Sequence, residues 1–203
     1  VGRAPWTLVN ERRLLIVGEA GAGKSHLLGD FGIRQLASGR PFVLVLTQTL
    51  GDAEPWPQIL QQLDLPDCRV AEFLGALDAA AEAAGSRAVV AIDALNERHG
   101  LQLWRDRLAG FLKSFEAFPR VSVILTLRST YEAHLPVPQL PKLVHHGFAG
   151  HASAAAKAYL DVRGIARTSS PNLLREFENP LFLRTCCDYL DEAGLKAIPK
   201  GLQ

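Results

Sequence analysis

The sequence lacks several features that would point to a specialised class of protein. Its 203 residues include no methionine and only three cysteines, and its net charge is +1. This balance gives no basic field for nucleic acid or an anionic membrane, and no apolar run reaches the roughly 18 residues of a membrane span. The cysteines Cys68, Cys186 and Cys187 have no disulfide-framework spacing. We therefore expect a cytoplasmic protein with reduced thiols and no direct contact with membrane or nucleic acid.

The two ends of the chain resemble cut points. The chain begins at Val1 without an apolar signal segment, and nothing in residues 198–203 caps a helix or closes a domain. We expect a fragment of a longer protein, whose true boundaries the sequence leaves open. Near the start, Trp6, Leu8 and Val9 are candidate packing anchors in an otherwise polar stretch.

The segment from Leu14 to Leu28 carries the clearest chemistry of the chain. Residues 18–25 read Gly-Glu-Ala-Gly-Ala-Gly-Lys-Ser and fit the phosphate-binding P-loop pattern GxxxxGK[ST]. An apolar strand is predicted before the pattern at residues 13–17, and an amphipathic helix follows to about residue 38. The pattern therefore stands in the strand–loop–helix context that a nucleotide phosphate site requires.

Each residue type in this pattern has a physical role. Glycines let the backbone approach an anion closely, and successive N–H groups face the phosphates at the positive end of a helix. Lys24 would place a charge on the β- and γ-phosphates, and the Ser25 hydroxyl would ligate Mg²⁺. The predicted nucleotide-binding residues are Gly18, Glu19, Ala20, Gly21, Ala22, Gly23, Lys24, Ser25 and His26.

The rest of the chain alternates strand and helix patterns. Strands are predicted at residues 42–46, 88–92, 121–127 and 142–146, and helices at 58–63, 70–84, 101–115, 154–162 and 180–193. The runs at 42–46 and 88–92 are wholly apolar, which is typical of strands buried on both faces. Residues 48–57 and the proline-rich stretch 131–141 are predicted loops. This alternation predicts an α/β fold with a parallel, doubly wound sheet and a ligand site at the carboxyl ends of the strands.

A second group of polar residues follows two of these strands. Asp93 ends an apolar strand, where a carboxylate can hold Mg²⁺ opposite the P-loop or simply cap the next turn. Glu97 could activate a water molecule for attack on the γ-phosphate, or be a solvated acid beside Arg98. Arg128, just past the strand 121–127, could contact the γ-phosphate or be a surface arginine, and Thr126 could add a hydroxyl.

Four segments, IVGEAGAGKSHLL, VVAIDALNE, VSVILTLRS and ENPLFLRTCCDYL, together resemble the STAND class of P-loop ATPases, near its NACHT branch. They are most similar to the NTPase modules of bacterial antiviral STAND ATPases, the Avs group. The resemblance implies an ASCE-type, AAA+-like three-layer core at residues 1–149, followed by a helical subdomain at 150–203 that is truncated before a winged helix. It also implies that the strand leading to Arg128 lies between the P-loop strand and the Asp93 strand.

The resemblance assigns roles to individual residues. It implies that Lys24 is the P-loop lysine, that Ser25 and Asp93 hold Mg²⁺, that Arg128 is the sensor residue, and that Pro180 lies near the adenine. Glu97 is retained, and Lys24, Asp93, Glu97 and Arg128 are the predicted catalytic residues. The implied cofactors are ATP or ADP with Mg²⁺. NACHT-like patterns commonly have an acid where this chain has Asn96, which points to slow hydrolysis.

The implied function is a slowly hydrolysing switch in antiviral signalling. ATP would bind between the core and the helical subdomain, the module would self-associate in the full-length protein, and absent regions would sense a viral or other protein trigger. An AAA+-type turnover ATPase acting on DNA or protein is the alternative, but it would favour a glutamate at Ala94. A third reading, a small-molecule P-loop kinase, would need a cluster of arginines in a lid, and the sequence has no convincing candidate for one. No guanine-reading motif or zinc-ligand spacing is present, so we expect ATP rather than GTP and no zinc.

Overall fold

The computed structural model describes residues 11–135, 140–166 and 175–198. The predictions that concern Trp6, Leu8, Val9, Pro136 and Pro138 lie outside these ranges. The chain divides into two compact units, of which the first comprises Val1–Val17 and Lys24–Val144. The second comprises Gly18–Gly23 and His145–Gln203. The predicted domain boundary after residue 149 stays a prediction, because the compactness of the two units does not show that either of them folds independently.

The first unit is built on a five-stranded sheet in the order β2-β3-β4-β1-β5. The recorded pairings of β2 with β3, β3 with β4 and β1 with β5 are all parallel, which confirms the predicted parallel sheet. The order also places β4, the strand that ends at Arg128, between β3 and β1 as expected. The strands are β1 (Arg13–Gly18), β2 (Phe42–Leu46), β3 (Ala88–Asp93), β4 (Val121–Arg128) and β5 (Lys142–Val144).

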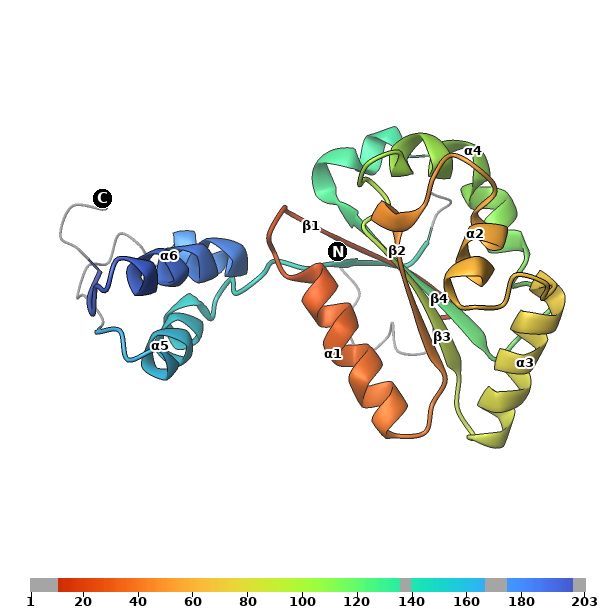
Figure 1. Cartoon of the computed structure of the whole chain (residues 1–203), viewed down its shortest axis with the longest axis horizontal. Helices are drawn as coiled ribbons and strands as arrows, with labels where there is room; N and C mark the ends of the chain where they lie inside the picture. Colours follow the sequence, from red (N-terminus) through yellow and green to blue (C-terminus); the bar gives the residue numbers. More distant parts are fainter. Residues whose placement is uncertain (1–10, 136–139, 167–174, 199–203) are drawn as a thin grey trace. The chain divides into compact units, whose positions relative to one another are not determined.

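Helices cover the two faces of this sheet unequally, as Figure 1 shows. Helix α1 (Lys24–Ala37) lies on one face, and α2 (Pro55–Gln62), α3 (Val70–Ala83) and α4 (Gly100–Lys113) lie on the other. The main core is on the three-helix side, where Trp104 is fully buried and packs edge-on against Phe111. The Trp104 indole also donates a 3.3 Å hydrogen bond to the hydroxyl of Thr47. The architecture is therefore a three-layer α/β sandwich.

Strand β2 differs from its prediction. Its apolar sequence indicated burial on both faces, but β2 is an edge strand and Leu44 is 39% exposed. Strand β3 has the same kind of sequence and is buried along its whole length, because it lies between β2 and β4. The position of a strand in the sheet, which composition does not encode, accounts for this difference.

Two predicted loops contain helical structure. Pro55 begins helix α2 inside the stretch predicted as loop, since proline at the first helical position gives up no needed hydrogen bond. A 3₁₀ turn, η2 (Thr47–Thr49), opens the same stretch. The second predicted loop contains the greater part of η3 (Ser129–His134). Among the described helices, none is long and apolar enough to cross a bilayer.

The second unit has its own small core around two helices, α5 (Ala152–Val162) and α6 (Pro180–Glu192), and the short turn η5 (Glu176–Glu178). Arg163 joins the two helices by ion pairs to Asp188 at 2.5 Å and Asp191 at 3.1 Å. Cys187 is fully buried, and this burial raises the pKa of its thiol to about 11. All three cysteines are free, and Cys187 belongs to the core of the second unit, with Cys186 partly buried against it.

Candidate functional site

The carboxyl ends of β3 and β4 bring Asp93 and Thr126 together. In the sheet register Ile92 lies opposite Leu125, so Asp93 and Thr126 are one step further at the same edge. The Thr126 hydroxyl donates a 2.6 Å hydrogen bond to Asp93 Oδ1 and accepts one of 2.7 Å from the backbone N–H of Ala94. Asp93 is 5% exposed and Thr126 is fully buried. This contact fixes one carboxylate oxygen and leaves Oδ2 as a candidate metal ligand.

We expect Thr126→Val to destabilise the chain by about 1–3 kcal/mol, because it removes one donor from a buried carboxylate and one acceptor from a backbone N–H. The matched variant Thr126→Ser keeps the hydroxyl and should lose clearly less. Chemical denaturation of the three proteins measures the difference. Equal losses in both variants would mean that the hydroxyl contributes no more to stability than the methyl group does.

Arg128 and Glu97 form the outer part of this group. Their side chains make an ion pair at 3.5 Å, and 42% of the Arg128 side chain and 34% of the Glu97 side chain are exposed. The backbone N–H of Arg128 donates a 3.0 Å hydrogen bond to the side-chain oxygen of Asn96. Asn96 is buried, so the residue that departs from the NACHT-like pattern here holds the end of β4 in place. An asparagine suits this contact because its carbonyl accepts without adding charge.

Lys24 is buried at the start of α1 within the electrostatic reach of the same residues. It is 8% exposed, and its pKa is lowered by burial and then by the positive charge of Arg128. Asp93 and Glu97 raise this pKa and so oppose part of the shift. The other three predicted catalytic residues, Asp93, Glu97 and Arg128, are therefore close enough to Lys24 to influence its charge. Two mutually repelling cations that are partly desolvated make a suitable place for a polyphosphate.

The lowered pKa of Lys24 gives a prediction with a definite sign. Between its folded pKa and the unfolded value of 10.5 the unfolded chain binds more protons. The charge on Lys24 therefore opposes folding at neutral pH, and this opposition fades as the pH rises toward 10.5. We expect Lys24→Met to raise the Tm of the nucleotide-free chain at neutral pH, because it removes the buried charge and keeps an unbranched apolar side chain.

Thermal melts of both proteins across the neutral and alkaline range test this expectation. The advantage of Lys24→Met should shrink as the pH rises, because the wild-type lysine then loses the proton that makes its burial unfavourable. A variant that melts below the wild type at neutral pH would contradict this account, since Lys24 would then stabilise the empty site.

The glycine-rich loop Gly18–Gly23 belongs to the second unit and contacts the start of α6. Gly21 and Gly23 have φ values of 74° and 97°, which disfavour any residue with a side chain. A Cβ atom at Gly21 would also come within 2.7 Å of the side-chain oxygen of Asn179. Pro180 lies beside Gly23, with its Cγ 3.7 Å from the position of a Cβ there. The loop and the predicted adenine-side proline are therefore neighbours.

Asn179 connects this loop to α6. Its side-chain oxygen accepts hydrogen bonds from the N–H groups of Leu181 and Phe182, at 3.0 and 3.3 Å, and so caps the helix. Its side-chain nitrogen donates a 2.9 Å hydrogen bond to the carbonyl of Ala20. The N–H of Leu181 also reaches the carbonyl of Gly21 at 3.2 Å. One side chain thus fixes both a helix end and the phosphate loop.

Four other predicted nucleotide-binding residues are exposed to solvent. Ser25 and His26 are exposed on the first turn of α1, and Glu19 and Ala20 are exposed in the loop. No cluster of three or more histidine, cysteine or acidic side chains suited to a metal exists in the described ranges. The predicted Mg²⁺ ligands, the carboxylate of Asp93 and the hydroxyl of Ser25, would hold the ion together with phosphate oxygens and water.

This strand order, with a glycine-rich loop after β1 and a carboxylate ending β3, is the α/β fold of P-loop nucleoside triphosphatases. Solved structures share it. A DNA replication initiation factor aligns over 92% of this chain and 56% of its own, with 10% identity and a TM-score of 0.58. AMPPCP-bound DnaA from Aquifex aeolicus aligns over 91% and 57%, with 10% identity and a TM-score of 0.59.

Cdc6p from Pyrobaculum aerophilum aligns over 95% of this chain and 60% of its own, with 12% identity and a TM-score of 0.53. The chain thus spans little more than half the length of these structures, and identities this low establish the fold alone. No family model matches the sequence. No curated protein matches it either.

Two positioning residues are more important in the structure than their sequence patterns indicated. The sequence indicated Thr126 only as a possible additional hydroxyl, but in the structure this hydroxyl donates a hydrogen bond to Asp93. Asn179 was only part of a motif, yet it holds Ala20, which is 159 positions away in the chain. The helix-capping position of Asn179 before Pro180 could have been recognised from sequence, whereas its contact with the phosphate loop could not.

Proposed function

We propose that this chain is the ATP-binding module of a P-loop ATPase. The observation that carries the proposal is the buried Lys24, which follows the glycine-rich loop directly and lies in the electrostatic field of Arg128, Asp93 and Glu97. A polyphosphate would relieve the repulsion between the two cations. ATP is favoured over GTP because the sequence has no guanine-reading motif.

The side chains would divide the work of binding. Lys24 and Arg128 would contact phosphate oxygens, and Ser25 and Asp93 would hold Mg²⁺, which neutralises phosphate charge when it is bound. Thr126 would keep the Asp93 carboxylate in one orientation. Glu97 would accept a proton from water, while its ion pair with Arg128 limits how freely it does so. Pro180 would form part of the adenine side of the site.

We further propose that the module is a slowly hydrolysing switch of the STAND class in antiviral signalling. The sequence motifs support this assignment, and so does the link from the phosphate loop to helix α6 through Asn179. A nucleotide that moves the loop would act on the capped end of that helix. In the full-length protein the module would self-associate, and regions outside this chain would sense a viral or other protein trigger.

A turnover ATPase of the AAA+ type, acting on DNA or protein, is the second candidate. The replication proteins that share the fold favour it, whereas Ala94, in place of a glutamate directly after Asp93, disfavours it. A switch is expected to retain ATP with turnover far below the about 1–10³ s⁻¹ typical of enzymes.

Steady-state phosphate release, measured with and without single-stranded DNA or an unfolded protein, separates the two candidates. Slow release that neither addition changes supports the switch. Release within the ordinary enzyme range, or strong stimulation by either addition, would favour the turnover ATPase.

A further inference from the structure

The first turn of α6 sets the orientation of two peptide groups in the phosphate loop, which belongs to the same compact unit. The carbonyl of Ala20 accepts from the Asn179 side chain at 2.9 Å, and the carbonyl of Gly21 accepts from the N–H of Leu181 at 3.2 Å. The C=O and N–H groups of a trans peptide point in opposite directions. The N–H of Gly21, which shares a peptide with the Ala20 carbonyl, is therefore directed away from α6.

Two N–H groups of this loop have no acceptor within the described part of the chain. They are the N–H groups of Gly21 and Gly23, and both residues are partly exposed. The N–H of Ala22 between them closes a turn on the carbonyl of Glu19 at 3.3 Å. Backbone N–H groups that converge in a glycine-rich turn form a concavity for an anion. The loop thus holds donors ready for phosphate oxygens, and α6 fixes the direction of one of them.

Asn179 is itself held in place by its surroundings. Its side-chain oxygen accepts from two N–H groups of α6, so the nitrogen of the same amide is left to face Ala20. The preceding carbonyl, that of Glu178, accepts a 2.8 Å hydrogen bond from the N–H of Phe148. A Cβ atom at Gly147 would come within 2.5 Å of this carbonyl oxygen, so the backbone segments pack closely there. The amide is therefore a fixed donor for the loop.

We propose that Asn179 is a positioning residue for the phosphates of the nucleotide, an inference that rests on the proposed ATP-binding function. Its hydrogen bond to Ala20 keeps the N–H of Gly21 turned toward the place where phosphate oxygens bind. Glycine allows the backbone wide rotation, so without this bond the peptide also adopts orientations that withdraw the donor. Because coupling between two equilibria is reciprocal, phosphate binding strengthens the contact between the loop and α6 by the same factor.

The variant Asn179→Ser separates the two contacts of this side chain. Serine caps a helix about as well as asparagine, but its side chain is shorter and does not reach Ala20. We expect the affinity for Mg²⁺–ATP to fall by about two- to tenfold, which is the contribution of one hydrogen bond. Inorganic tripolyphosphate has no adenine, so an equal loss of affinity for it places the effect in the phosphate loop. Isothermal titration calorimetry measures both ligands.

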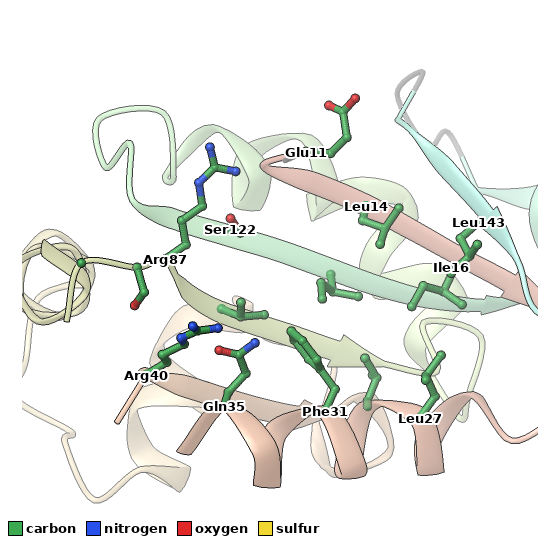
Figure 2. Close-up of a pocket in the computed structure, with 15 residues that line it drawn as sticks. Glu11, Leu14, Ile16, Leu27, Phe31, Gln35, Arg40, Arg87, Ser122 and Leu143 are labelled. Atoms are coloured by element: carbon green, nitrogen blue, oxygen red, sulfur yellow. The ribbon is translucent and has the colours of Figure 1, made fainter. Parts of the chain in front are cut away.

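A second variant and a matched control complete the titration. Asn179→Asp keeps the helix cap but replaces the donor with a negative charge, so it should lose more affinity than Asn179→Ser, and salt should reduce the additional loss. Gln35→Ser also replaces an amide with a hydroxyl. Figure 2 shows Gln35 at the groove of about 650 Å³ beside α1, about 16 Å along this helix from its first residue. This control should bind both ligands like the wild type.

Hydrogen exchange provides a readout that a purely structural role of Asn179 would not change. The N–H of Leu181 donates to the loop and to the Asn179 side chain. Saturating Mg²⁺–ATP should slow its exchange in the wild type, and should slow it less in Asn179→Ser.

Three results would overturn the proposal: equal affinities in Asn179→Ser and the Gln35→Ser control, a loss for ATP that tripolyphosphate does not show, or Leu181 exchange that ATP leaves unchanged in the wild type. A wild-type chain that binds neither ligand would overturn the ATP-binding function as well. A wild-type chain that binds both, beside an Asn179→Ser variant that binds them equally well, would remove only the role of Asn179.

Discussion

Replacing Lys24 with alanine will lower the affinity for Mg²⁺–ATP by about ten- to a hundredfold, since a hydrogen bond to a charged group contributes about 1.5–3 kcal/mol and 1.4 kcal/mol is tenfold. Lys24 is 8% exposed and lies in the electrostatic field of Asp93 and Arg128. A cation from the solvent would therefore not readily take the place of the lysine charge. Circular dichroism of the variant checks that it remains folded, so that a loss of affinity reports on binding.

Isothermal titration calorimetry measures this loss. Lys113→Ala is the control, because Lys113 is an exposed lysine at the end of α4, and it should bind ATP like the wild type. If Lys24→Ala binds within about threefold of the wild type, less than 1 kcal/mol, the P-loop interpretation is wrong.

Replacing Glu97 with glutamine will reduce ATP turnover by about 10²–10⁴-fold, the usual contribution of a general base. The change keeps the size of the side chain and removes its charge. Glu97 is partly exposed and pairs with Arg128 at 3.5 Å, so its carboxylate is accessible to water. ATP affinity should remain within a few fold, because Lys24 and the loop stay intact.

Glu116→Gln is a matched control for this experiment. Glu116 also pairs with an arginine, Arg13, at 3.5 Å, and its side chain is more exposed. Turnover should be unchanged in this variant. A Glu97→Gln protein that hydrolyses ATP normally would remove Glu97 from the chemistry. One that loses affinity instead would mean that Glu97 acts on nucleotide binding through Arg128.

The local signals in the sequence predict the elements of the sheet well. Each of β3 and β4 is an apolar run of strand length that ends in a polar residue, and those residues, Asp93 and Arg128, are brought to the same edge. This agreement has a physical cause, because parallel strands share the direction in which their ends point. Candidate site residues that were identified only because they follow a strand are therefore neighbours in the structure.

The remaining features depend on contacts that sequence patterns do not encode. Strand β2 is as apolar as β3, but its place at the sheet edge leaves Leu44 exposed. The role of Thr126 follows from the register between β3 and β4, and that of Asn179 from a contact across the chain. Helix α1 has apolar residues at helical spacing, yet Leu36 is 58% exposed.

The measurement that tests the central claim most directly is a calorimetric titration of the unaltered chain with ATP, with and without Mg²⁺. We predict one site per chain that binds ATP much more tightly when Mg²⁺ is present. Binding that Mg²⁺ does not affect would contradict the roles of Ser25 and Asp93. No binding under either condition would contradict the proposal that this chain is an ATP-binding module.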